Sequence, residues 1–457
     1  MLVFVKLAVA LTTLLSLAAS LIAATVVPPG PLLGTQVWTS ANSPYLISGD
    51  VTVGNSGRIF IQEGVEVLFS STDSAAAGYD PARCEFRVLS GLLVVNGSKT
   101  NPVVFRAMSN AAPMAWYGIT VTNGLGAFIT NAWIQDAYTG LRSDNTNLTV
   151  LDHVTLCSNR WGAALGQGLS THIYPGILNA LRVFQNTNGL ILGTLSSTRV
   201  NNCLIYSNLV RGVAVSSSVD FINDTFHANG IGVDAGGFSG LTSRLLNCIF
   251  SSNSIALACG APDGGSVPFG FVMEPRHCAF WGNAVNLFDP SPPYFNLSTG
   301  QNAVFGNPLY ANPLGPDGLA GTADDDFTLS AGSACIDAGS NTNAFGLSVD
   351  FLGNPRRVDD PLTPDAALYT NTPPVVDIGA YEYQPPLRIL SVRYEPETVS
   401  LAVPTVPGGQ YQLLSTPDFL QWTNVVGGDF VGDGLVQTQT LSTAASPFLF
   451  YRVQRAP

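Results

Sequence analysis

NCLIYSN, at residues 202–208, is the stretch that decides the fold, because variants of it return along the middle third of the chain. Every variant ends in an asparagine, and these residues are Asn159, Asn186, Asn208, Asn229, Asn253 and Asn283. The successive intervals are 27, 22, 21, 24 and 30 residues. A phrase that recurs at such intervals is typical of a solenoid, in which one structural unit stacks on the next.

Each repeat has the pattern of short strands separated by tight turns. In 202–208 the apolar Ile205 follows Cys203 by two positions, and a second strand, Gly212-Val-Ala-Val, comes soon after Asn208. Side chains of a strand alternate between two faces, and no segment here carries a helical stripe with a 3.6-residue period. We therefore expect an all-β chain with a parallel β-helix over residues 45–305.

Asparagine at fixed positions has a physical reason in such a fold. Asparagine tolerates the left-handed backbone of a tight turn, and amides stacked about 4.8 Å apart can bond to one another along the axis. A second column lies six residues earlier and comprises Asn202, Asn223 and Asn247, with His153 and His277 at the same offset. We interpret the two histidines as turn residues that replace asparagine; a metal or catalytic role is the alternative.

Two further columns follow from this alignment. Four charged residues of alternating sign, Arg199, Asp220, Arg244 and Glu274, occupy one position of successive coils. They predict an exposed ladder of ion pairs, each worth about 0–1 kcal/mol, which fixes the register. The second column is the outward row of the strand after the asparagine, and it is mostly small and apolar: Arg142, Ala164, Ile191, Ala214, Gly232 and Ala256. Apolar strips are usually covered, so we expect another part of the chain or a partner to pack there.

Composition and the N-terminus bound the class of protein. Residues 1–24 combine Lys6 with a long apolar run and small residues near its end, which predicts a secretory signal peptide. No later run is long enough to span a membrane, so we expect a secreted or extracellular-surface protein. The formal net charge of −12 argues against a nucleic-acid partner. Of the seven cysteines, Cys203, Cys248 and Cys278 share one repeat position and predict a buried ladder; a disulfide such as Cys259–Cys278 is the alternative.

The part of the chain that follows the repeats resembles a known family. Residues 306–383 contain GNPLY, SACIDAGS, DFLGNPRR and VVDIGAYEY in this order. This stretch resembles the choice-of-anchor Q segment, which closes the C-terminal end of many secreted bacterial proteins with a right-handed, pectin-lyase-like parallel β-helix. The resemblance implies a closing segment at 306–385 and an exported or surface-exposed protein, without an agreed activity. Residues 388–457 resemble a small C-terminal β-domain of secreted bacterial proteins, and we expect a β-sandwich with Trp422 and Tyr451 in its core.

Few residues suggest chemistry. Asp317, Asp324, Asp325 and Asp326 lie in a glycine-rich loop, which suits calcium as a cofactor; a solvated acidic turn is the alternative. Asp152, His153 and Arg160 are the candidates for a polysaccharide lyase, because Leu151-Asp152-His153 resembles a pectate-lyase phrase. Lys99, the one lysine that follows Lys6, is predicted to lie far from the central coils. Five aromatic residues are candidates for stacking on sugars: Trp116, Tyr117, Trp133, Trp161 and Trp281.

Two functions of different classes follow. The first is a non-catalytic secreted or cell-surface protein that acts in glycan binding, adhesion or envelope structure, with a polysaccharide or a cell-envelope component as partner. The alternative is a polysaccharide lyase or glycoside hydrolase, which needs a cationic base or converging carboxylates.

Overall fold

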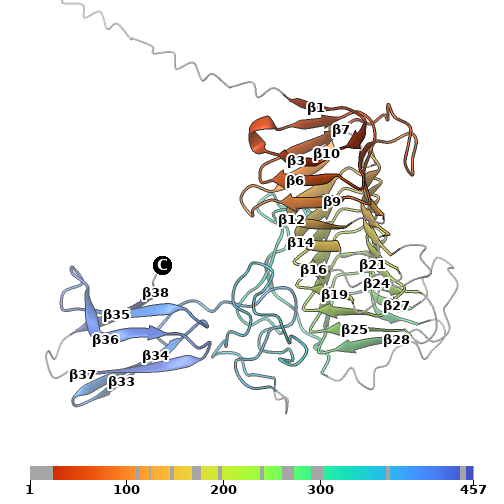
Figure 1. Cartoon of the computed structure of the whole chain (residues 1–457). Helices are drawn as coiled ribbons and strands as arrows, with labels where there is room; N and C mark the ends of the chain where they lie inside the picture. The colour runs from red at the N-terminus through yellow and green to blue at the C-terminus, as the bar shows by residue number, and fades with distance from the viewer. Residues whose placement is uncertain are drawn as a thin grey trace, which may run out of the picture.

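The computed structural model describes most of the chain after residue 23. The described residues are 24–109, 114–122, 125–144, 149–166, 177–193, 198–236, 241–259, 272–289, 302–366, 371–442 and 449–455. The predicted signal peptide therefore lies outside them except for its last residue. The described chain is all-β, with a long parallel β-helix, an irregular segment beside it and an antiparallel domain at the C-terminal end (Figure 1). No helix among these residues is long and apolar enough to cross a membrane.

The β-helix is built from three stacks of parallel strands, and stacks 1 and 2 together form one 19-stranded sheet. Stack 1 comprises β3 (Thr35–Trp38), β6 (Arg58–Gln62), β9 (Leu92–Asn96), the first parts of β12 (Gly126–Gln135) and β14 (Thr149–Cys157), β16 (Ile177–Asn179), β19 (Thr198–Asn201), β22 (Val219–Ile222), β25 (Thr242–Leu246) and β28 (Val272–Arg276). Stack 2 comprises β1 (Thr25–Val27), β4 (Tyr45–Ile47), β7 (Glu66–Phe69), β10 (Val103–Ala107), the last parts of β12 and β14, β17 (Arg182–Phe184), β20 (Leu204–Tyr206), β23 (Thr225–His227), β26 (Ile249–Ser251) and β29 (Ala279–Trp281).

Stack 3 is a separate 11-stranded sheet. It comprises β2 (Gly30–Leu32), β5 (Val51–Val53), β8 (Glu85–Leu89), β11 (Gly118–Thr122), β13 (Thr139–Ser143), β15 (Trp161–Leu165), β18 (Asn188–Leu192), β21 (Arg211–Val215), β24 (Ile231–Ala235), β27 (Ile255–Cys259) and β30 (Val285–Phe288). The predicted parallel β-helix is confirmed, and its stacking begins at β1, before the predicted start at residue 45.

The turn between stacks 1 and 2 explains the second asparagine column. In each coil from β12 to β28, one residue adopts a left-handed backbone there, with φ between 48° and 56°: Asn131, His153, Ala180, Asn202, Asn223, Asn247 and His277. Asparagine adopts this conformation more readily than most residues. The interpretation of His153 and His277 as turn residues is therefore confirmed.

The asparagines that close each phrase form a continuous buried ladder. The side-chain Nδ2 of each donates a hydrogen bond to Oδ1 of its neighbour in the next coil, at 2.9–3.1 Å. The backbone N–H of the same residue donates to that oxygen as well. These amides satisfy one another without any charge, which is how a buried polar row becomes stable.

In the last coils of stack 3, the register differs from the predicted one by two residues. Val213 pairs with Val233, and Val233 pairs with Leu257. The position of Gly212 is continued by Gly232, because a Cβ at Gly212 would lie 2.8 Å from the carbonyl oxygen of Gly232. The outward row after Ala214 is therefore Asp234 and Ala258, and the prediction of Gly232 and Ala256 there was wrong.

An irregular closing segment, residues 306–385, lies along the outer face of stack 2. Its regular structure among the described residues is one antiparallel pair, β31 (Tyr310–Asn312) and β32 (Asp326–Leu329). Phe327 and Tyr381 pack on Tyr206 and Phe184 of stack 2. The closing segment thus covers stack 2. In the outer row of stack 3, Ala164, Asp234 and Ala258 are buried, so the expected burial of that row occurs in part.

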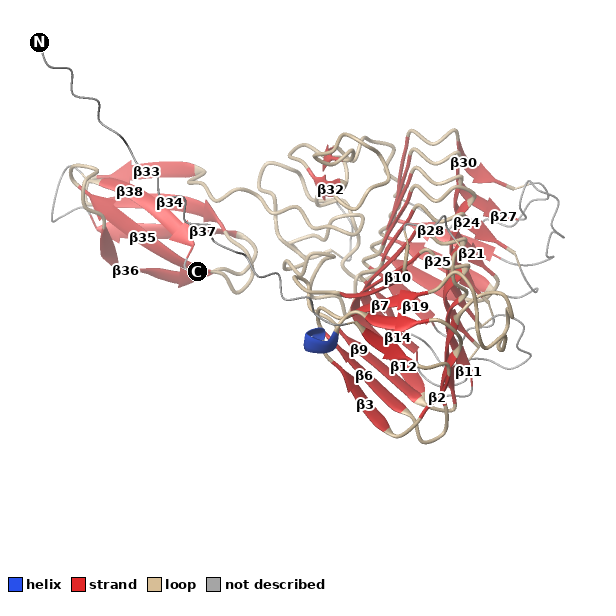
Figure 2. Ribbon diagram, turned by 90° about the horizontal axis from the view of Figure 1, so that it is seen from above, coloured by secondary structure: helices blue, strands red, loops and turns tan. Residues whose placement is uncertain are grey.

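The C-terminal domain consists of two three-stranded antiparallel sheets with one shared apolar core. One sheet contains β33 (Ser391–Glu395), β34 (Thr398–Pro404) and β37 (Val436–Ser442), and the other contains β35 (Gln410–Thr416), β36 (Thr423–Val431) and β38 (Phe450–Arg455). Tyr451 packs against this core as predicted, whereas Trp422 lies outside it, under the guanidinium of Arg452. Figure 2 shows the closing segment between this domain and the β-helix.

Candidate ligand-binding groove

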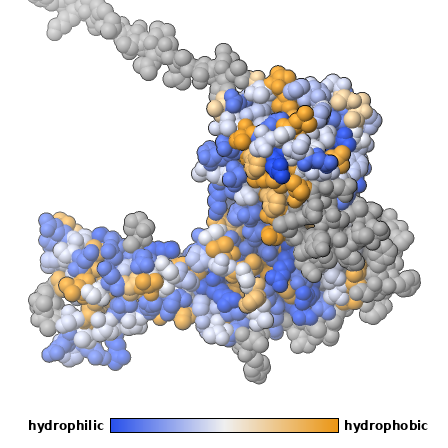
Figure 3. Space-filling view, viewed as in Figure 1, coloured by the Kyte–Doolittle hydropathy of each residue, from blue (hydrophilic) through white to orange (hydrophobic). Residues whose placement is uncertain are grey.

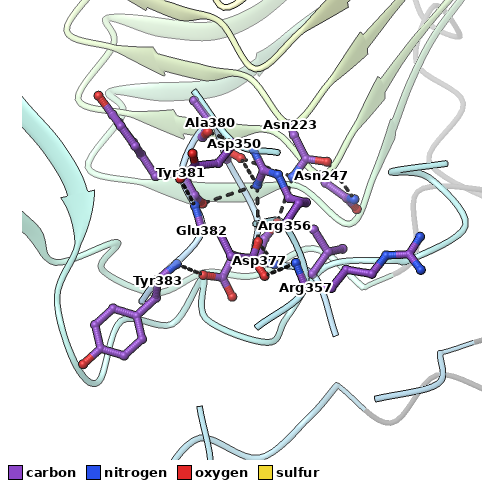
Figure 4. Close-up of polar contacts among 12 residues, drawn as sticks. Asn223, Asn247, Asp350, Arg356, Arg357, Asp377, Ala380, Tyr381, Glu382 and Tyr383 are labelled. Carbon is purple, nitrogen blue, oxygen red and sulfur yellow. Dashed lines mark hydrogen bonds and ion pairs between the residues drawn. The ribbon is translucent and has the colours of Figure 1, made fainter. Parts of the chain in front are cut away.

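The residues that carry the family resemblance form a buried polar clip between the closing segment and the β-helix (Figure 4). Arg356 is its centre: Nη2 donates to Asn202 Oδ1 at 2.6 Å and to the carbonyl of Ala380 at 2.8 Å. Nη1 of Arg356 lies 3.5 Å from Glu382 Oε2, and both side chains are fully buried. The clip therefore joins the turn column of the solenoid to the closing segment.

Other members of the turn column bind the closing segment in the same way. Asn223 Nδ2 donates to the carbonyl of Asp377 at 2.8 Å. Asn247 Nδ2 donates to the carbonyl of Ser340, and the N–H of Ser340 donates back to Asn247 Oδ1. Most of this column thus contacts the closing segment, and one amide pair, Asn247 to Asn223 at 3.3 Å, connects its members directly.

The clip is structural, since its charges are enclosed and bonded internally. Burial raises the pKa of Glu382 to about 7, although Arg356 counteracts this effect. Burial and the neighbouring Glu382 carboxylate also raise the pKa of Asp377 well above its ordinary value. Raised carboxyl pKa values are common at catalytic sites, but these two groups are buried within the clip.

A solvent-filled groove of about 640 Å³ lies between the outer face of stack 1 and the closing segment. Its lining residues come from β19, β22, β25, β28 and the closing segment: Arg199, Asp220, Ile222, Arg244, Leu246, Arg276, Asn341, Thr342, Asn343, Phe345, Arg357 and Thr372. Four arginines and one aspartate line it, and Glu274 lies beside Arg276, so the excess of positive charge is two. In Figure 3, hydrophilic residues gather where the lower coils meet the closing segment.

The charged column predicted from the repeats forms one wall of this groove. Arg199 pairs in register with Asp220, Asp220 with Arg244, and Arg244 with Glu274, so the predicted column is confirmed. The expected ladder forms in part. Arg244 holds Asp220 through two hydrogen bonds of 2.7 and 2.5 Å.

The remaining arginines of this wall are less fully paired. Arg276 contacts Glu274 of its own strand at 2.6 Å. Its Nε is buried and has no hydrogen-bond partner among the described residues. No ion pair joins Arg199 to another residue in the part of the chain that the structure describes. Arg199 therefore retains donors for a ligand, and Arg276 lines the groove with a partly exposed side chain.

The opposite wall adds an aromatic ring and neutral polar groups. Phe345 is 76% exposed, so its ring is accessible. Arg357 Nη2 donates to the carbonyl of Asn341 at 3.2 Å, which fixes the guanidinium at the rim. The groove therefore combines cationic donors, amides and one accessible ring.

The predicted lyase residues do not assemble into one site. Asp152 Oδ1 lies 3.0 Å from His153 Nδ1 and accepts a hydrogen bond from Asn179 at 2.7 Å. Burial raises the pKa of Asp152, but these two hydrogen bonds outweigh it and leave the pKa below its ordinary value. Arg160 instead lies over the ring of Tyr138 and donates to its hydroxyl.

The prediction that Lys99 lies far from the central coils was wrong. Lys99 lines a cavity of about 310 Å³ together with His153 and Arg182. Its Nζ donates to the carbonyl of Leu352 in the closing segment at 2.8 Å. The separation along the sequence suggested that this lysine was remote, but stacking of the coils brings residues of distant sequence side by side.

The predicted calcium loop is closed by its own hydrogen bonds. Asp324 Oδ2 accepts from the N–H of Asp317 at 3.2 Å, and Asp325 Oδ2 accepts from the N–H of Gly321 at 2.7 Å. Asp326 Oδ1 accepts from Thr328. Calcium at this loop stays a prediction.

The aromatic candidates divide by exposure. Trp116 is fully buried and stacks on Phe69, with ring centroids 3.8 Å apart, so it belongs to the core. Tyr117 is also buried, and Trp133 packs against the cluster beneath the closing segment. Trp161 is half-buried, whereas Trp281 is 44% exposed.

All seven cysteines are buried and none of them forms a disulfide, so the disulfide alternative does not occur. A scan against models of protein families finds no match to this chain, and a search of curated proteins finds none either. The arguments for function therefore depend on the groove and its residues. Sequence reasoning found one wall of it from the repeats and missed the other, because residues 341–372 carry no repeat.

Proposed function

We propose that this protein binds an acidic polysaccharide in the groove between stack 1 and the closing segment. The observation that carries the proposal is the concentration of four arginines around one groove in a chain whose formal net charge is −12. Such a local excess of positive charge attracts an anionic ligand even though the whole protein is acidic.

The chemistry of the lining suits a charged sugar chain. A guanidinium presents a planar set of donors that matches a carboxylate or sulfate group in a bidentate contact. Arg199 and Arg276 supply such donors, and Phe345 offers a face on which a sugar ring can stack. Asn343 and Thr342 are suited to hydroxyl groups.

The proposed binding is non-catalytic. Hydrolysis of a glycosidic bond generally needs two carboxyl groups at the scissile bond. The one carboxylate of the groove lining, Asp220, is held by Arg244. The resemblance of residues 306–383 to the choice-of-anchor Q segment supports an exported protein with a pectin-lyase-like β-helix at the cell surface or outside the cell, where such polysaccharides occur.

A second candidate function, polysaccharide lyase activity, rests on the cavity that Lys99, His153 and Arg182 line together. A lyase needs a base to remove a proton and a positive charge to stabilise the developing anion. This cavity contains groups of both kinds, next to the ionised Asp152.

Glycan-binding measurements test the first proposal. The purified protein is titrated with polygalacturonate, alginate and chondroitin sulfate, and with neutral dextran. We expect binding of at least one anionic polymer, a loss of affinity of about tenfold or more in Arg199→Ala/Arg276→Ala, and weakening with salt. Arg393→Ala is the matched control, because Arg393 is an exposed arginine of the C-terminal domain. Equal binding by the double variant and this control would refute the proposal.

The same mixtures distinguish the lyase. Ultraviolet absorbance of unsaturated products, lost in Lys99→Met, would establish cleavage. Unchanged absorbance over a long incubation with every polymer would exclude it for these substrates.

A further inference from the structure

Three acidic side chains of the closing segment that are not part of the groove lining lie close together. Asp337, Asp359 and Asp365 each place a carboxylate oxygen within 4.8 Å of those of the other two. Carboxylates in water avoid such proximity, because their charges repel. Among the described residues, this is the group of acidic, histidine or cysteine side chains whose ligand atoms are close enough to share one ion.

A second observation points to a ligand. Asp337 is fully buried, and its Oδ2 accepts a hydrogen bond from the N–H of Asp360 at 3.1 Å. Its Oδ1 is buried and has no hydrogen-bond partner among the described residues, and the same holds for Oδ1 of Asp365. A buried carboxylate oxygen without a partner is costly, so two of them at one cluster require a compensating group.

Among the described residues, the strongest charges around Asp337 offer no such group. The charges that act on Asp337 are those of Asp359, Glu382 and Asp365, all negative. The nearby cation Arg356 is already bonded to Glu382 and Asn202.

The backbone holds the three carboxylates in place from both sides. A turn begins at Asp360. The N–H of Thr363 donates to the carbonyl of Asp360, and the hydroxyl of Thr363 donates to its Oδ2. This turn leads to Asp365, and the N–H of Ala366 then donates to the carbonyl of Asp337 at 2.8 Å. The N–H of Asp359 donates to the carbonyl of Gly434 in the C-terminal domain at 3.0 Å. A preformed set of oxygen ligands lowers the ordering cost of binding an ion.

We propose that Asp337, Asp359 and Asp365 form a binding site for a hard divalent cation, calcium above all. Calcium takes several oxygen ligands in adaptable geometry and is the usual choice of clustered carboxylates. The site is distinct from the predicted loop at residues 317–326 and independent of the groove and its ligand. Because Asp359 is bonded to Gly434, the ion would also brace the junction between the closing segment and the C-terminal domain.

Calorimetry and thermal unfolding of the chelator-treated full chain test this site. We expect calcium chloride to bind with about one ion per chain and to raise the melting temperature by about 3 °C or more. In Asp359→Asn/Asp365→Asn both the heat and the rise should disappear. This variant spares the fully buried Asp337, and circular dichroism checks that it is folded.

One control variant and the response of the wild type make the outcome decisive. Asp317→Asn/Asp324→Asn alters the other acidic loop and should keep the full calcium response. If the response disappears in this control and persists in Asp359→Asn/Asp365→Asn, the ion belongs to the loop and the proposal is overturned. If wild type gives neither heat nor a rise in melting temperature with calcium or magnesium, the cluster is stabilised by protons and the proposal is also overturned.

Discussion

The β-helix and the closing segment solve the same problem, the burial of polar groups, by opposite means. In the β-helix the buried row consists of neutral amides, Asn159 to Asn283, that bond to one another from coil to coil. In the closing segment the buried groups are charged, with Arg356, Asp377 and Glu382 in one network. A row of amides requires only stacking, whereas buried charges require partners and respond to pH and ions. The comparison predicts which changes each region will tolerate.

Removal of the clip's cation should have the largest effect. Arg356→Met leaves Glu382 and Asp377 buried without their counter-charge and deprives Asn202 of a donor. We expect a loss of about 3–5 kcal/mol in the free energy of unfolding, measured by denaturant or thermal unfolding. Arg357→Met is the control, because the neighbouring guanidinium is only partly buried and should cost little. Equal losses in the two variants would show that the clip does not hold the segment.

The amide ladder should show a smaller and position-dependent effect. Asn208→Ala removes the side-chain bonds to Asn186, Asn229 and the carbonyl of Val183. We expect a loss of about 2–3 kcal/mol, because buried backbone and amide groups are left without partners. Asn283→Ala, at the end of the ladder, should cost about 1 kcal/mol in the same unfolding experiment. A loss that does not depend on position would contradict the idea that neighbouring coils share these bonds.

The same contrast explains how far the sequence could be interpreted. The β-helix, the amide ladder and the column from Arg199 to Glu274 were predictable, because each is a repeated local rule. The register error at Gly232 arose because Gly230 offered a second possible alignment of the coil. In the structure, the close approach of Gly212 to the backbone of Gly232 determines the register.

The closing segment was predictable only as a resemblance, because its contacts join residues far apart in sequence. Arg356 meets Asn202 across 154 positions, and no local spacing reports such a pair. The Asp337 cluster escaped prediction for the same reason, whereas the contiguous acids of residues 317–326 drew attention. The groove is lined by both regions, so only the wall that the repeats form could be predicted from the sequence.

The interface between the two regions should respond to acid through His227. This side chain lies on stack 2 against Phe327 and Tyr310 of the closing segment, and burial lowers its pKa to about 4. The unfolded chain binds this proton near pH 6.5. The contribution of His227 to stability is therefore complete above pH 6.5 and is lost as the pH falls toward 4.

Comparison with His227→Gln isolates this effect. We expect the stability difference between wild type and the variant to shift by about 1–2 kcal/mol against wild type from pH 7 to pH 5. Buried carboxyls such as Glu382, whose pKa is raised, gain relative stability over the same range in both proteins and cancel in the difference. A difference that does not change with pH would mean that water reaches this histidine beneath the closing segment.

The exposed ion pair of the groove wall should have the smallest effect on stability. A double-mutant cycle with Asp220→Ala and Arg244→Ala should give a coupling of about 0–1 kcal/mol that decreases with salt. Arg199→Ala should cost still less, because no ion pair joins this side chain to another described residue. A column that contributes so little to folding is free to serve a ligand, which is the reverse of the clip. If the coupling instead reaches the size expected for Arg356, the column holds the coils together, and the same arginines are then poor candidates for binding an acidic polysaccharide.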